Sequence, residues 1–300
     1  TLRVFLELAK QTQACGEPTC YEIFNNELKA QFDVFAPLLT KEDPRHGEEK
    51  STFFTSYYTP TLEGSRNRTG VFKHGIYQLP GTDSLKKSTR VQIVFEDRLE
   101  GKGLADFYVK DLFDLYMLHI QGGGRIVFSE NGEEKSKYIH YNGTNAQTFR
   151  WISKYMIEKG YITDGRIESQ RAYLLAHPEK EREIYEYCPS YIYYAEKDFP
   201  ATGSGGVSVT NGRSIATDWR HYGYKGLLTY IEAERPTETS IPTNVEYKPF
   251  SRFMLDQDTG GAIQGKARVD IFHGENDYAE MAAYNTKHTG KLYYLMLKQR

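Results

Sequence analysis

The feature that most constrains the fold is a long series of short strand-like runs separated by glycine-rich turns. It begins with FFTSYYTP, residues 53–60, an aromatic run that Pro60 ends, and it continues to about residue 145 with GIYQLP, TRVQIVF, YMLHIQGGGRIVF and KYIHYNG. Runs of this length, rich in aromatic and β-branched residues and bounded by turn residues, are typical of strands. Many short strands in succession predict a β-barrel or a β-sandwich here.

A block of helices follows, and after it a second β region begins. TFRWISKYMIEKG places apolar residues on one helical face and ends at Gly160, and SQRAYLLAH and PEKEREIYEYC predict two further helices. Strands resume at SYIYYAE, and beyond residue 198 the chain becomes rich in Gly, Ser and Thr, with β runs up to KLYYLMLK. With a helical pattern at the start, TLRVFLELAKQTQA, the sequence predicts a mainly β protein of two units with a few helices.

Charge and composition exclude several classes of partner. The 38 Lys and Arg against 40 Asp and Glu give a formal charge of −2 without a block of one sign, so no nucleic acid and no anionic membrane surface is expected. No apolar run approaches the roughly 20 residues of a transmembrane helix. Cys15 and Cys20 are close enough in sequence for a disulfide, and whether they bond stays open. No His or Cys spacing indicates a zinc site, and we expect no metal and no cofactor.

Two aspartates in QDTGGAIQGKARVDIFHG, residues 257–274, are candidate functional residues. Asp258 precedes Gly260 and Gly261, so a turn can account for it. Asp270 lies inside Val-Asp-Ile-Phe, a run that otherwise predicts a buried strand. A carboxylate there costs free energy unless it is paired or used. The residues themselves leave four interpretations open.

Two of the four interpretations fit the spacing poorly. Asp258-Thr259-Gly260 matches the tripeptide of aspartic proteases, but that chemistry needs two such loops and the chain has one copy. Asp218, Asp258 and Asp270 together offer three carboxylates to a calcium or magnesium ion, yet they are spread far more widely than such ligands usually are. Neither class of site is favoured.

The other two interpretations concern how Asp270 is used. In the structural one, Asp258 caps a turn and Asp270 pairs with Arg268 or Arg213. The other interpretation is carbohydrate chemistry. In it, apolar surroundings and a nearby acid raise the pKa of Asp270 so that it can serve as a general acid. The run TGSGGVS, residues 202–208, resembles the Gly-x-Ser-x-Gly nucleophile motif only loosely and lacks its strand-turn-helix setting.

Several longer motifs occur in one order over most of the chain: FFTSYYTP, HIQGGGRI, YNGTNAQTFRWIS, CPSYIYY, NGRSIATD and QDTGGAIQGKARVDIFHG. In this combination the chain closely resembles the membrane-bound lytic murein transglycosylase A family, from about residue 53 to the C-terminus. The resemblance implies a double-psi β-barrel built from both chain ends, residues 1–62 and 198–300. It also implies an inserted smaller β-barrel, residues 63–197, with a substrate groove between the two.

The resemblance implies site residues as well. It makes Asp270 the single catalytic acid, Asp258 its supporting neighbour and Asp218 a third aspartate of the barrel. The matched motifs place sugar-binding positions at Thr55, Tyr57, Tyr58, Gln121, Gly122 and Gly124, and Asp218 is counted with them. Tyr58 is expected to stack on a sugar, and Gln121 to hydrogen-bond hydroxyl or acetamido groups. The charge of His273, beside the catalytic strand, is expected to tune the pH profile.

The implied activity is cleavage of the β-1,4 bond between N-acetylmuramic acid and N-acetylglucosamine, with a 1,6-anhydromuramoyl product. The alternatives are an inverting glycan hydrolase and a non-catalytic glycan-binding protein on the same fold. The resemblance further implies a monomer whose partners are peptidoglycan strands. It implies a periplasmic location, often as an outer-membrane lipoprotein whose acylated Cys would lie upstream of Thr1.

Overall fold

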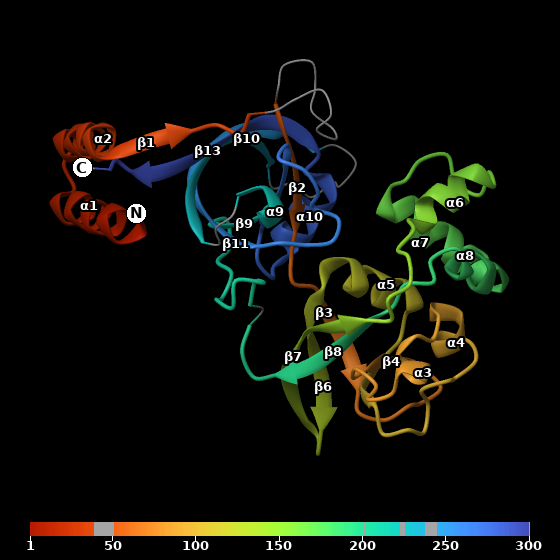
Figure 1. The fold of residues 1–300 in the computed structure, drawn as a ribbon. Coiled ribbons are helices and arrows are strands. Elements are labelled where there is room, and N and C mark those ends of the chain that lie inside the picture. Colours follow the sequence, from red (N-terminus) through yellow and green to blue (C-terminus); the bar gives the residue numbers. More distant parts are fainter. Residues whose placement is uncertain (39–50, 201, 223–225, 238–244, 300) are drawn as a thin grey trace. The chain divides into compact units, whose positions relative to one another are not determined.

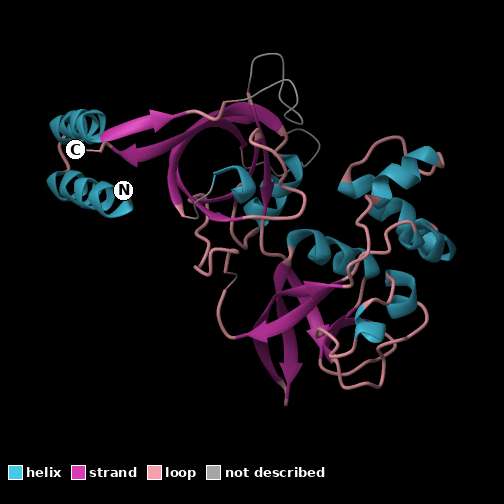
Figure 2. Cartoon of the chain, viewed as in Figure 1, coloured by secondary structure: helices cyan, strands magenta, loops and turns pink. Residues whose placement is uncertain are grey.

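A computed structural model describes residues 1–38, 51–200, 202–222, 226–237 and 245–299 of the protein (Figure 1). The chain divides into two compact units. The first unit combines both chain ends, Thr1–Tyr58 and Thr202–Arg300, and the second unit is Thr59–Ala201. Each unit has its own β-sheet and its own hydrophobic core. The fold is mainly β with a few helices, as the sequence predicts (Figure 2).

The strands of the first unit close into a barrel. Hydrogen bonding runs in the order β13, β10, β11, β9, β12, β2, and β2 pairs again with β13, while β1 extends the sheet beyond β13. The pairs β11–β9 and β12–β2 are parallel. The elements of this unit are α1 (Leu2–Cys15), α2 (Pro18–Gln31), β1 (Phe32–Phe35), β2 (Thr52–Tyr57), β9 (Ser214–Ala216), α9 (Trp219–Tyr222), β10 (Leu227–Pro236), β11 (Tyr247–Asp258), β12 (Arg268–Phe272), α10 (Asp277–Asn285) and β13 (His288–Leu297).

The interior of this barrel is apolar because alternate side chains of its strands point inward. In β2 the alternation is regular, with every second residue buried. Buried side chains from six strands form one cluster: Phe54, Ile215, Ile231, Phe250, Met254, Val269, Ile271, Leu292 and Tyr294. This packing fixes the strands that carry the candidate site.

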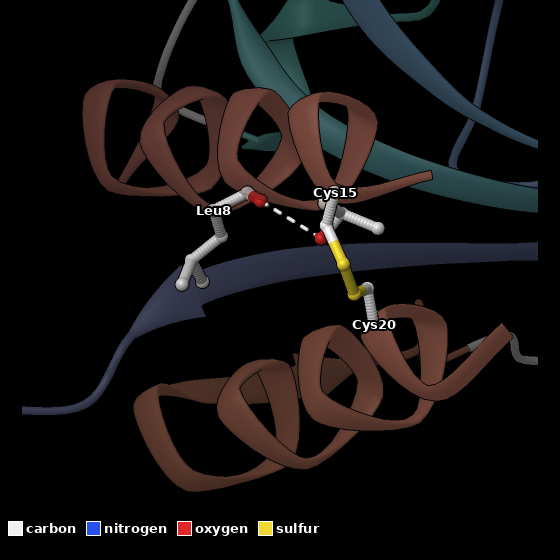
Figure 3. Close-up of a disulfide and its surroundings, with 4 residues drawn as sticks. Leu8, Cys15 and Cys20 are labelled. Carbon is white, nitrogen blue, oxygen red and sulfur yellow. Dashed lines mark hydrogen bonds between the residues drawn. A yellow bond between two sulfur atoms is a disulfide. The ribbon is translucent and has the colours of Figure 1, made fainter. Parts of the chain in front are cut away.

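The N-terminal helices form a hairpin closed by a disulfide, which settles the point that the sequence left open. Cys15 ends α1 and Cys20 lies in the first turn of α2, and the two are bonded (Figure 3). Gly16 ends α1 in the left-handed conformation, with φ 73°, and Pro18 begins α2. In Figure 1 both helices lie beside the paired ends of β1 and β13.

The second unit carries a six-stranded sheet in the order β4, β5, β3, β6, β7, β8. A bridge between Gln78 and Tyr194 joins its two edges, so this sheet also curls into a barrel. Its elements are β3 (Thr61–Ser65), β4 (His74–Tyr77), α3 (Asp83–Lys86), α4 (Arg90–Val94), β5 (Ala105–Val109), α5 (Leu112–Gln121), β6 (Gly123–Glu130), β7 (Glu133–Thr144), α6 (Ile152–Glu158), α7 (Ile167–Ala176), the 3₁₀ turn η1 (Pro178–Lys180), α8 (Glu181–Glu186) and β8 (Ile192–Lys197).

Two segments expected as strands are helices. In TRVQIVF, Thr89 accepts from the Gln92 backbone while the Gln92 side chain accepts from the Thr89 backbone, a capping box that starts α4. In the run before the glycines, Asp111 caps α5 and left-handed Gly122 ends it. Helix α5 is buried on nearly all sides, so its sequence shows no contrast between an apolar and a polar face.

Candidate active site

Strand β12 presents Asp270 as the one residue of its run that is not fully buried. Its parallel pairing with β2 sets Asp270 opposite Thr55 and Phe272 opposite Tyr57. The Thr55 hydroxyl donates to Oδ1 of Asp270. The strand therefore holds a half-buried acid whose carboxyl accepts a hydrogen bond from a hydroxyl of the neighbouring strand.

Burial is the main reason why the pKa of Asp270 lies above its ordinary value. The negative charge of Asp258 raises this pKa further, while Arg268 and the Thr55 hydrogen bond lower it. The Arg268 guanidinium donates to the carbonyl of Val269, at 3.0 Å from Nη1. The influence of Arg268 expected in the structural interpretation is present, but it does not outweigh burial.

Asp258, at the end of β11, receives hydrogen bonds on both oxygens. Tyr57 Oη donates to Oδ2 at 2.9 Å, and the backbone N–H groups of Ser204 and Thr259 donate to Oδ1 at 2.8 Å each. Burial, and then the charge of Asp258, hold the pKa of Tyr57 well above its ordinary value, so its phenol remains a donor. Asp258 is thus a fixed acceptor near Asp270.

Tyr58 is placed differently from its expected role. The residue is 6% exposed, which leaves little surface for a sugar to stack on. Its hydroxyl lies 2.8 Å from that of Tyr284 and donates to Glu280 at 3.1 Å. Tyr58, the residue after β2, therefore links the end of that strand to α10, and we assign it a packing role.

Asp218, the third aspartate, lies in the turn after β9 and is 2% exposed. Arg220 donates to its two oxygens, at 2.7 Å from Nε and 2.6 Å from Nη2, and the Gly265 backbone N–H donates at 2.8 Å. These bonds, with that of Arg220 the strongest cause, lower the pKa of Asp218 to about 2. Asp218 is an ionised barrel residue that fastens one turn to another.

A fourth aspartate, Asp256, was missed in the sequence. It is fully buried and accepts from Thr217 Oγ1 at 2.7 Å and from Trp219 Nε1 at 3.0 Å. Burial raises its pKa to about 6. The alternation of side chains along β11 would have identified it. Phe250, Met254 and Asp256 are separated by even numbers of residues, so they lie on the same, inward-facing side of the strand.

The expected effect of His273 on the pH profile is wrong. The side chain is 4% exposed, and burial, helped by Arg235 and Arg252, lowers its pKa to about 4. His273 is therefore neutral at ordinary pH. In the part of the chain that the structure describes, no group of three His, Cys, Asp or Glu side chains is arranged to hold a metal ion.

The three insert positions belong to the second unit. Gln121 is the last residue of α5, and Gly122 follows it with φ 81°. A Cβ at position 124 would lie 2.9 Å from the Pro60 carbonyl oxygen, so backbone packing requires a glycine there. A role of these positions in sugar binding stays a prediction.

Two family models match the chain, one in each part. Residues 53–195 match the MltA specific insert domain, and residues 213–296 match the 3D domain. The membrane-bound lytic murein transglycosylase A of Vibrio cholerae is 28% identical over 276 residues, which are 90% of this chain and 71% of that protein. The Escherichia coli protein of the same name is 29% identical over 254 residues, 81% of this chain and 65% of that protein.

Solved structures agree with this result. E. coli MltA with bound chitohexaose has a TM-score of 0.74 at 26% identity, covering 84% of this chain and 74% of that one. A membrane-bound lytic murein transglycosylase from Agrobacterium tumefaciens has a TM-score of 0.74 at 25% identity, covering 98% and 83%. The chain belongs to the membrane-bound lytic murein transglycosylase A family, and with it to the lytic transglycosylases that act on peptidoglycan.

Proposed function

We propose that the protein cleaves the β-1,4 bond between N-acetylmuramic acid and N-acetylglucosamine, with Asp270 as the only acid and base. The observation that carries this proposal is the different engagement of the four aspartates. Asp218 is bound to Arg220, Asp256 is fully buried, and Asp258 accepts from three donors. Asp270 alone combines partial exposure with a raised pKa.

The reaction needs one carboxyl in two protonation states. Protonated Asp270 donates its proton to the glycosidic oxygen, and the bond from that oxygen to the anomeric carbon of muramic acid breaks. The resulting Asp270 carboxylate then takes the proton of the 6-hydroxyl of the same sugar, whose oxygen bonds to the anomeric carbon and closes the 1,6-anhydro ring. Because the nucleophile is part of the substrate, its effective concentration is high and no water is required.

An inverting hydrolase is the alternative, and it needs a second carboxylate to activate water. The engagement of Asp218, Asp256 and Asp258 speaks against any of them in that role. Glycan binding has support from the relative whose structure contains chitohexaose. We propose peptidoglycan strands as the partner of a monomeric protein.

Product analysis tests this proposal. Purified peptidoglycan is digested with the protein, with Asp270→Asn, and with Asp33→Asn, a control that removes an exposed carboxylate from β1. Mass spectrometry should find fragments lighter by one water than reducing-end muropeptides with the unmutated protein and the control, and none with Asp270→Asn. Reducing-end fragments from the unmutated protein would instead identify a hydrolase.

We also propose a periplasmic location with attachment to the outer membrane through a lipidated cysteine outside these 300 residues. The names of the relatives describe them as membrane-bound. Within the described ranges, no helix has the length and apolar character needed to cross a bilayer. Fractionation of cells that make the full-length protein should find it with the outer membrane, and recovery in the cytoplasm would contradict this location.

A further inference from the structure

The loop at residues 202–206 has no role in the chemistry described so far, yet it contacts Asp258 directly. The Ser204 backbone N–H donates to Asp258 Oδ1 at 2.8 Å, and the Ser204 hydroxyl donates to the Thr259 carbonyl at 3.2 Å. The Gly205 N–H donates to the Gln257 carbonyl at 3.1 Å. Ser204 and Gly205 therefore bind three successive residues, 257–259, where β11 ends.

Two glycines permit this approach. A Cβ at position 203 would lie 2.4 Å from the Gln257 carbonyl oxygen and 3.2 Å from Cβ of Asp258. A Cβ at position 205 would lie 2.9 Å from the same oxygen. Because that oxygen belongs to the backbone, relief of either overlap requires the loop or the end of β11 to move.

The loop has internal bonds that make it a defined turn. The Gly203 N–H donates to the Val207 carbonyl at 2.9 Å, and the Gly206 N–H donates to the Gly203 carbonyl at 2.8 Å. A bridge between Thr202 and Ser208 closes its base. A shift at Gly203 would therefore be passed to the N–H of Ser204.

We propose that this loop is a positioning element for catalysis, in which Gly203 and Gly205 allow the backbone N–H of Ser204 to hold Asp258 in its place near Asp270, where both aspartates pair with Ala216 of β9 from opposite sides. The inference rests on the proposed function, because it acts through Asp258 on the acid of that reaction. Tyr57 holds the other oxygen of Asp258 from β2, so the carboxylate is fixed from two sides. Ser204 contributes through its main chain and is not a nucleophile.

The position of Asp258 matters because its charge raises the pKa of Asp270. Among the described residues, Arg268 on its own strand and Tyr57 on β2 also interact electrostatically with Asp270. The residue that pairs with Asp270 on β9 is Ala216, which carries no charge. If Asp258 moves away, the pKa of Asp270 falls, and less of the acid is protonated at a given pH.

The test uses three glycine variants. Gly203→Ala has the larger overlap and Gly205→Ala the smaller one, while Gly261→Ala is a matched control in the neighbouring loop, where a Cβ meets nothing within 4 Å. Gly203→Ala should lower kcat about 10-fold to 100-fold with KM nearly unchanged. It should also move the alkaline limb of the pH–rate profile to lower pH. Gly205→Ala should do the same to a smaller extent, and Gly261→Ala should do neither.

A second readout does not depend on activity. The Asp270 carboxyl carbon is titrated by NMR in the same variants, and its pKa should fall in the order control, Gly205→Ala, Gly203→Ala. An unchanged Asp270 titration in a folded Gly203→Ala protein would overturn the proposal, and Gly205→Ala decides if Gly203→Ala does not fold. Failure of the proposed function is recognised separately, because the unmutated protein would then release no anhydro product.

A double-mutant cycle tests whether the loop acts through Asp258. In an Asp258→Asn protein the charge is already removed, so adding Gly203→Ala should have little further effect on the Asp270 titration. Additive effects of the two changes would show that the loop acts by another route and would contradict the proposal.

Discussion

The turn after β9 and the middle of β12 each hold an aspartate, and their surroundings shift the pKa of the two carboxyl groups in opposite directions. At the turn, Asp218 receives two hydrogen bonds from Arg220 side-chain nitrogens and one from the Gly265 backbone, and its pKa falls to about 2. In β12, Asp270 lies between apolar neighbours with the Thr55 hydroxyl as its donor, and its pKa rises. The hydrogen bonds from Arg220 make Asp218 a structural anion, whereas burial makes Asp270 able to carry a proton.

The largest effect that this comparison predicts comes from removal of the Asp270 acid. Asp270→Asn keeps the size of the side chain but cannot donate a proton to the leaving oxygen, so turnover of peptidoglycan should fall about 10²-fold to 10⁴-fold. Initial rates measured beside the Asp33→Asn control check this. A loss of less than tenfold in a folded variant would exclude Asp270 as the acid.

Asp256 extends the comparison to a fully buried carboxyl, and its effect is on stability. Its folded pKa of about 6 lies above the ordinary unfolded value, so the folded protein binds more protons and stability falls as pH rises from about 4 to 6. Two pKa units correspond to about 3 kcal/mol. Asp256→Asn, which can accept from Trp219 and donate to Thr217, should abolish this decline.

Urea unfolding of both proteins at pH 4 and pH 7 measures that difference. The unmutated protein should lose more stability than Asp256→Asn between the two pH values. The same decline in both proteins would assign it to another group.

Asp218 should show the opposite dependence on pH. Its folded pKa of about 2 is depressed, so its contribution is complete above the unfolded pKa near 4 and is lost as pH falls toward 2. Because the side chain of Arg220 is 71% exposed, solvent screens the pair, and we expect Asp218→Asn to cost about 1–2 kcal/mol at pH 7. Unfolding free energies should converge with those of the unmutated protein near pH 2, and a constant difference down to that pH would contradict this account.

The smallest effect concerns Thr55. Its hydrogen bond lowers the pKa of Asp270, so Thr55→Val should raise that pKa and move the alkaline limb of the rate profile to higher pH. This direction is opposite to the one expected for Gly203→Ala. A limb that moves to lower pH in Thr55→Val would mean that the hydroxyl stabilises the protonated acid instead.

Much of the fold follows from local patterns in the sequence, and the failures have physical causes. Most strands of both units, the helices at residues 152–158 and 167–176, and Asp270 in its apolar run agree with periodicity and turn chemistry. Helices α4 and α5 were missed because a buried helix has the apolar density of a buried strand. Their caps, Thr89 and Asp111, were the available signals.

The candidate site was predictable only in part. Asp258 and Asp270 share one short segment, but the contact with Ser204 joins positions 54 residues apart in sequence, and the bond from Thr55 to Asp270 joins positions 215 residues apart. Such pairs depend on strand order, which no local pattern contains. The burial of His273 and Tyr58 was missed for the same reason.

Direct titration of Asp270 and Asp218 in one sample tests the central claim. Asp-selective ¹³C labelling of the carboxyl carbons, with assignment from Asp270→Asn and Asp218→Asn spectra, gives both pKa values by NMR. We predict that Asp218 titrates near pH 2 and that Asp270 titrates above the ordinary aspartate value. An Asp270 carboxyl that titrates together with Asp218 would show that β12 does not hold a protonated acid, and it would contradict the proposed mechanism.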